Sequence, residues 1–98
     1  QIVFEESPVT LFKAIKNETE LAGFKACHIR DGVAMVKFLH WLETSVPKGG
    51  ISEISASDKL EALRAEQEFF QGLSFESISS YNEHGAVVHY TSSPETDV

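Results

Sequence analysis

Four histidines carry the chemistry for metal binding or proton transfer near neutral pH, namely His28, His40, His84 and His89. A metal pair on one helix needs two histidines four residues apart. His28 and His40 are twelve residues apart, which puts them about 120° apart around a helix, so they cannot share a metal ion. His28 lies on an apolar stripe, and a core histidine is the favoured interpretation. His40 is interpreted as a packing or surface residue, and we expect His84 in a solvated turn.

His89 is the candidate catalytic residue. It closes an apolar run of residues 85–88 and is followed by Tyr90 and a polar turn. A polar ring at the mouth of a β element is a suitable place for a substrate contact. An ordinary strand-end side chain remains the alternative, because position alone does not separate the two. No Ser-His-Asp arrangement or phosphate loop is predicted, and Glu95 and Asp97 are not assigned as ligands.

A β-hairpin over residues 75–90 would position His89. Residues 77–80 alternate small polar and apolar side chains, and residues 86–88 favour strands. Between them, Asn82 and Gly85 suit a tight connection. We therefore expect two short antiparallel strands with His89 at the far end of the second.

A long helix is predicted from residue 18 to about residue 45, because apolar residues recur there at spacings of three and four. Asn17 is the predicted N-cap, with Glu20 three residues later in a capping-box pattern. The helix would be about 42 Å long. Two adjoining apolar stripes predict that most of its circumference is buried.

A second helix should begin at a cap on Ser52 or Ser55 and end near Gly72, after Pro47 has ended the first. Residues 1–16 are interpreted as a lead-in segment from a preceding domain. Within that segment we expect a strand at residues 2–4 and extended chain at residues 9–12.

Composition indicates a folded segment of 98 residues, with 42% hydrophobic residues and a net charge of −7. That charge argues against nucleic acid or an anionic membrane as partner, and no apolar run reaches the ~20 residues of a membrane span. The start lacks a signal peptide and is Gln rather than Met, so we expect a piece of a longer protein. Cys27, the single cysteine, is interpreted as a small buried hydrophobe in a reducing compartment.

Several short motifs occur in a fixed order: K-N-x-x-E-L at residues 16–21, H-I-x-D at 28–31, W-L-E at 41–43, V-P-K-G-G-I-S-E-I-S-A-S-D-K-L-E-A-L-R-A-E-Q at 46–67, L-S-F-E-S-I-S-S at 73–80 and G-A-V-V-H-Y-T-S-S-P-E-T at 85–96. In order and spacing the sequence resembles the Xaa-Pro aminopeptidases (aminopeptidase P), in their long cytosolic form.

The resemblance implies an α+β fold, an incomplete pita-bread fold in which the helices pack on a β-hairpin of a curved antiparallel sheet. Residues 17–98 would be the first half of that catalytic domain. The implied activity is release of the N-terminal residue from peptides with proline at the second position. A non-catalytic pita-bread binding module is the alternative.

The resemblance also implies two divalent metal ions, manganese or zinc, in the full-length parent. Their ligands would lie beyond Val98, so we expect no metal ligand in this segment and no activity from it alone. His89 matches the histidine of the family's H-Y pair, which contacts substrate and is thought to assist proton transfer or to stabilise the intermediate. Peptides as partners, a homodimer and a cytoplasmic location are implied as well.

Overall fold

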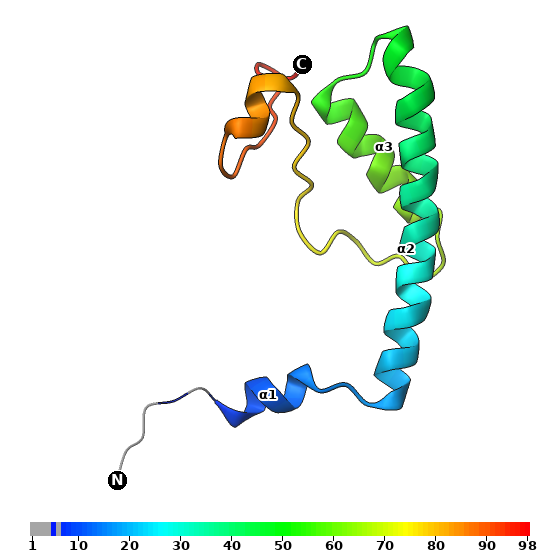
Figure 1. Cartoon of the computed structure of the whole chain (residues 1–98), viewed down its shortest axis with the longest axis vertical. Helices are drawn as coiled ribbons and strands as arrows, with labels where there is room; N and C mark the ends of the chain where they lie inside the picture. The colour runs from blue at the N-terminus through cyan, green and yellow to red at the C-terminus, as the bar shows by residue number, and fades with distance from the viewer. Residues whose placement is uncertain (1–4, 6) are drawn as a thin grey trace.

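The computed structural model describes residue 5 and residues 7–98. In chain order the elements are α1 (Pro8–Ala14), α2 (Glu18–Ser45), the 3-10 helix η1 (Val46–Lys48), α3 (Glu53–Ala65) and the 3-10 helix η2 (Asn82–Ala86). Helix α2 forms the long axis, α1 lies at its N-terminal end, and α3 packs against its C-terminal half (Figure 1). The strand predicted at residues 2–4 lies outside the described residues.

Helix α2 confirms the prediction for the long helix, at both ends. The side chain of Asn17 accepts a hydrogen bond from the backbone N–H of Glu20 at 2.9 Å, which satisfies a donor that the first helical turn leaves without a partner. Glu18 and Glu20 place negative charge at this positive end of the helix dipole. The helix gives way to η1, where Pro47 lacks the N–H needed to continue.

Burial of α2 is much smaller than predicted. Ala34 is its one buried residue, and large apolar side chains along the helix remain exposed, among them Leu21, Phe24, Ile29, Val33, Val36 and Leu39. The prediction of a largely buried circumference is therefore wrong for this structure, because α3 covers only one side of α2 within the described residues.

Helix α3 begins with a reciprocal capping box. Ser52 Oγ accepts from the Ser55 N–H at 3.2 Å, and Ser55 Oγ accepts from the Ser52 N–H at 2.8 Å. Ser52 is thus the cap. The predicted end near Gly72 is wrong, since α3 stops at Ala65. Phe69, at φ +64°, has a left-handed backbone that cannot continue a right-handed helix.

The predicted α+β, incomplete pita-bread class with its β-hairpin is wrong for this structure, because residues 5 and 7–98 form helices and coil without a strand. Asn82 and His89 have φ values of +52° and +54°, which interrupt extended backbone. The N–H groups of His84 and Val87 bond to carbonyls three residues earlier, as in a 3-10 helix. A lone two-stranded hairpin is marginal in water, and local helical bonds replace it here.

The extended chain predicted at residues 9–12 is also wrong. Pro8 occupies the first turn of α1, where its missing N–H costs nothing, and Ser7 Oγ accepts from the Val9 N–H at 3.3 Å. In the described part of the chain, none of the helices combines the length and the apolar character that crossing a bilayer requires.

Candidate functional site

A buried carboxylate lies at the centre of the candidate site. Glu53, the first residue of α3, is 2% exposed and is the one buried charged residue in the described part of the chain. Its Oε1 accepts from the Tyr90 hydroxyl at 2.6 Å, and its Oε2 accepts from the Tyr81 backbone N–H at 2.7 Å. His84 Nδ1 lies 3.0 Å from Oε2. A buried charge needs hydrogen-bond partners in place of the water that burial removes, and these donors supply them.

The N-terminus of α3 also gathers the end of the chain. The Ile54 N–H donates to Asp97 Oδ1 at 2.9 Å, and the Glu53 N–H donates to the Val98 carbonyl at 2.8 Å. These contacts satisfy N–H groups that the first helical turn leaves without partners. The positive end of the helix dipole favours the carboxylates of Glu53 and Asp97, which both lie there. The segment that follows η2 is therefore held against the start of α3.

His84 and Tyr90 contact one another as well as Glu53. Their rings stack with centroids 4.7 Å apart and planes at 27°, and His84 Nδ1 lies 2.9 Å from the Tyr90 hydroxyl. An ionised carboxylate only accepts hydrogen bonds, so these contacts assign the hydrogen of His84 to Nδ1. The His84 side chain is 21% exposed, and the prediction that it lies in a solvated turn is wrong.

Burial raises the pKa of Glu53, whereas the hydrogen bonds from Tyr90, Tyr81 and His84 lower it. The donors prevail, so the pKa of Glu53 lies below the ordinary value of a glutamate. The carboxylate is ionised at neutral pH and stabilises the folded chain in that form.

Replacing Glu53 by Gln should reduce the acid sensitivity of the fold. Because the pKa of Glu53 is lowered on folding, its stabilising effect is present above the ordinary glutamate pKa of about 4.3 and is lost as the pH falls through the lower folded value. From pH 7 to pH 3, the stability measured by thermal unfolding should fall more steeply in wild type than in Glu53→Gln. The difference in slope corresponds to at most about one proton taken up on unfolding. Glu61→Gln, at an exposed position of α3, is the matched control; equal slopes in all three proteins would contradict the prediction.

His89 lies in the turn between η2 and Tyr90, is exposed, and has φ +54°. It does not end a strand. Its ring lines neither of the two cavities described below. The structure thus places the predicted catalytic residue, exposed, next to the group formed by Glu53, Tyr81, His84 and Tyr90, called the Glu53 cluster below.

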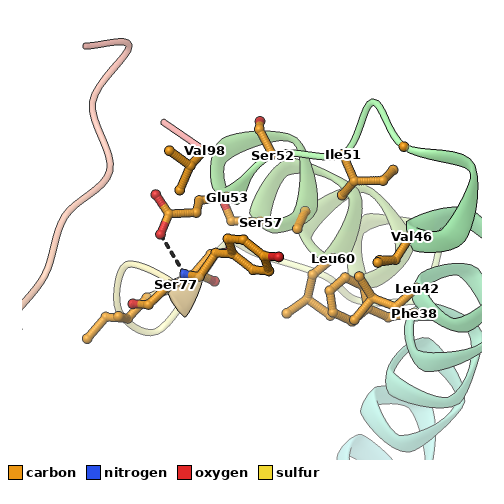
Figure 2. A pocket seen from close by; sticks show the side chains of 16 residues that line it. Phe38, Leu42, Val46, Ile51, Ser52, Glu53, Ser57, Leu60, Ser77 and Val98 are labelled. Atoms are coloured by element: carbon orange, nitrogen blue, oxygen red, sulfur yellow. Dashed lines mark hydrogen bonds between the residues drawn. The ribbon is translucent and has the colours of Figure 1, made fainter. Parts of the chain in front are cut away.

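Two open cavities flank α3. The first, of about 560 Å³, lies between the C-terminal half of α2, the start of α3 and residues 77–81. Figure 2 shows its apolar wall, with Phe38, Leu42 and Leu60 on one side and Glu53 at the opposite edge; the dashed line is the bond from the Tyr81 N–H. The second cavity, of about 390 Å³, is lined by residues of α2, by Arg64 of α3 and by the chain after α3.

The remaining candidate residues lie apart from the Glu53 cluster. His28 is exposed on α2, with Nδ1 2.7 Å from the Phe24 carbonyl, so the prediction of a core histidine is wrong. His40 is exposed. Cys27 is exposed rather than buried. In residues 5 and 7–98, no group of three or more His, Cys, Asp or Glu side chains is arranged to hold a metal ion.

Sequence reasoning missed Glu53, although a signal was present. Glu53, Ala56, Leu60 and Leu63 follow one another at helical spacings of three and four, so the carboxylate begins the apolar stripe of α3. A charged residue on a buried stripe needs partners. Those partners, His84 and Tyr90, are 31 and 37 residues away in sequence, and no local pattern connects them to Glu53.

Comparison with known proteins places these residues in a family context. The model of metallopeptidase family M24 matches residues 22–98. The chain is 50% identical over 86 residues to a probable Xaa-Pro aminopeptidase P of Aspergillus clavatus, 54% over 86 residues to one of Paracoccidioides brasiliensis, and 51% over 90 residues to one of Chaetomium globosum. These alignments cover 86% to 90% of this chain. The chain spans only 13% to 14% of the length of these relatives.

Proposed function

Because the chain belongs to metallopeptidase family M24, we propose that it is a segment of an aminopeptidase that releases the N-terminal residue from peptides with proline at the second position. The observation that carries the proposal is the identity of 50% to 54%, over most of the chain, to proteins named Xaa-Pro aminopeptidase P. The substrates of the full-length protein are then short peptides with a penultimate proline.

The metal of this peptidase is proposed to be a pair of divalent ions, manganese or zinc. The described residues do not fit such a pair, since no group of three or more His, Cys, Asp or Glu side chains comes together among them. As the resemblance to the Xaa-Pro aminopeptidases implies, the ligands are proposed to lie in the rest of the full-length polypeptide. By itself this segment would hydrolyse nothing.

His89 is the residue of this chain proposed to act on the peptide, by contacting it and by holding or passing a proton. Two features support this role. Its ring is exposed, and its backbone has a left-handed conformation that is costly for a residue other than glycine and tends to occur at functional sites. The next residue, Tyr90, is held by its hydrogen bond to Glu53. The backbone on one side of the exposed His89 ring is therefore anchored.

The full-length protein is further proposed to be a cytoplasmic homodimer. The support for both the location and the dimer is the resemblance of this chain to the long cytosolic aminopeptidases.

Substrate preference tests the proposal. The purified full-length protein, supplied with Mn²⁺ or Zn²⁺, should release arginine from Arg-Pro-Pro at least about tenfold faster than from Arg-Ala-Ala, because a pocket shaped for one side chain discriminates by about 10- to 200-fold. Equal rates would contradict the proline preference. Absence of turnover on both peptides with either metal would favour a non-catalytic binding module of the same family.

A further inference from the structure

The loop of residues 84–90 closes on a single carboxylate. At one end, His84 Nδ1 lies 3.0 Å from Glu53 Oε2; at the other, the Tyr90 hydroxyl donates to Oε1 at 2.6 Å. Nδ1 and the hydroxyl lie 2.9 Å apart, and the two rings stack. Glu53 therefore fixes both ends of this 84–90 loop.

His89 occupies the exposed part of the 84–90 loop, directly before its anchored end. Tyr90 is 8% exposed and is held at both its hydroxyl and its ring, whereas Val88 is 82% exposed. Among the described backbone hydrogen bonds, the last one before His89 joins the Val87 N–H to the His84 carbonyl at 3.1 Å. The main restraint on His89 is thus its anchored neighbour.

The backbone conformation of His89 also indicates that its position depends on the anchored Tyr90. His89 has a left-handed φ of +54°, as Phe69 and Asn82 also do, and this conformation costs energy for a residue with a side chain when nothing holds it. Release of the Tyr90 hydroxyl would let the backbone of His89 relax, and the ring would then move.

We propose that Glu53 and Tyr90 are positioning residues, which hold the imidazole of His89 in its reactive direction by closing the 84–90 loop. This inference rests on the proposed role of His89 in peptide hydrolysis. Glu53 touches no substrate in this account and acts through Tyr90. A merely structural role for the cluster is the competing explanation.

Tyr90→Phe in the full-length enzyme tests the inference, because it removes one hydroxyl and keeps the ring stacked on His84. We expect kcat on Arg-Pro-Pro to fall about tenfold with KM changed less than about twofold, since small displacements of a catalytic group cost up to about 10²-fold. Tyr81→Phe is the matched control: Tyr81 is 59% exposed and reaches Glu53 through its backbone N–H. Full activity of Tyr90→Phe would overturn the proposal.

A double-mutant cycle separates positioning from structural support. If Tyr90 acts through His89, adding Tyr90→Phe to His89→Ala should lower the residual kcat by less than about twofold, because the two residues act as a unit. A structural role would lower kcat equally in both backgrounds, and that result would overturn the proposal. Glu53→Gln replaces one of the two acceptor oxygens by an NH2 group, so the side chain can no longer accept at both ends of the 84–90 loop, and it provides a second cycle with the same criterion. Melting temperature and metal content identify any variant that fails to fold.

The same cycle distinguishes failure of this inference from failure of the proposed function. If His89→Ala keeps wild-type turnover, the proposed role of His89 in hydrolysis is wrong, and the positioning inference that rests on that role is overturned with it. If His89→Ala loses turnover while Tyr90→Phe and Glu53→Gln do not, the role of His89 stands and the positioning inference alone is overturned.

Discussion

The isolated 98-residue chain should release no arginine from Arg-Pro-Pro, with or without Mn²⁺ or Zn²⁺. Metal-assisted peptide hydrolysis needs ions that polarise the carbonyl and activate a water molecule. Within residue 5 and residues 7–98, no cluster of three or more His, Cys, Asp or Glu side chains could hold such an ion. The full-length protein, assayed with the same peptide and metals, should turn the peptide over.

Metal binding should follow the same pattern as peptide turnover, absent in the isolated chain and present in the full-length protein. Isothermal titration of the isolated chain should detect no tight site for Mn²⁺ or Zn²⁺, whereas the full-length protein should retain metal through gel filtration. Turnover by the isolated chain, measured on protein purified away from host aminopeptidases, would show that this segment contains a catalytic centre and would contradict the assignment of the metal ligands to other parts of the polypeptide.

His89→Ala in the full-length enzyme should lower kcat on Arg-Pro-Pro by about 10²-fold. A side chain that donates or accepts a proton at the reacting atoms contributes about 10²- to 10⁴-fold, and the lower end applies because the metal would remain in place. KM should change little if His89 acts mainly on the transition state. Metal content should equal that of wild type, since no metal ligand is assigned to this chain.

His40→Ala is the matched control for His89→Ala. His40 is also an exposed histidine of this chain, but it lies on α2 away from the Glu53 cluster. We expect it to keep wild-type kcat. A loss of activity that accompanies loss of metal in His89→Ala would assign His89 to the metal site instead, and full activity would remove it from the reaction.

The sequence predicted α2 well because its signals are local. Asn17, the apolar spacing and Pro47 lie within or beside the helix itself, and the structure begins and ends the helix within a residue or two of these signals. The start of α3 at Ser52 was predicted for the same reason. The resemblance to Xaa-Pro aminopeptidases also came from ordered local motifs, and identities of 50% to 54% to proteins of that name confirm it.

The prediction of a hairpin is wrong because strand formation by such segments depends on residues that are distant in sequence. Residues 77–80 and 86–88 carry strand-favouring side chains, yet strand propensity is weak and depends on what the strand packs against. Tyr81 gives its N–H to Glu53, 28 residues away, and η2 forms beside it. The partial burial of His84 and the burial of Tyr90 follow from the same long-range contact. A short alternation of residue types contains no information about that carboxylate.

A crystal structure of the full-length enzyme with a non-hydrolysable Arg-Pro-Pro analogue would show whether His89 contacts the peptide while Tyr90 is held by Glu53. We expect a ring nitrogen of His89 to lie within about 3.2 Å of a polar atom of the bound peptide, while the Tyr90 hydroxyl still donates to Glu53. An imidazole of His89 that points away from the peptide, or a Tyr90 hydroxyl bonded elsewhere while His89 contacts the peptide, would contradict this expectation.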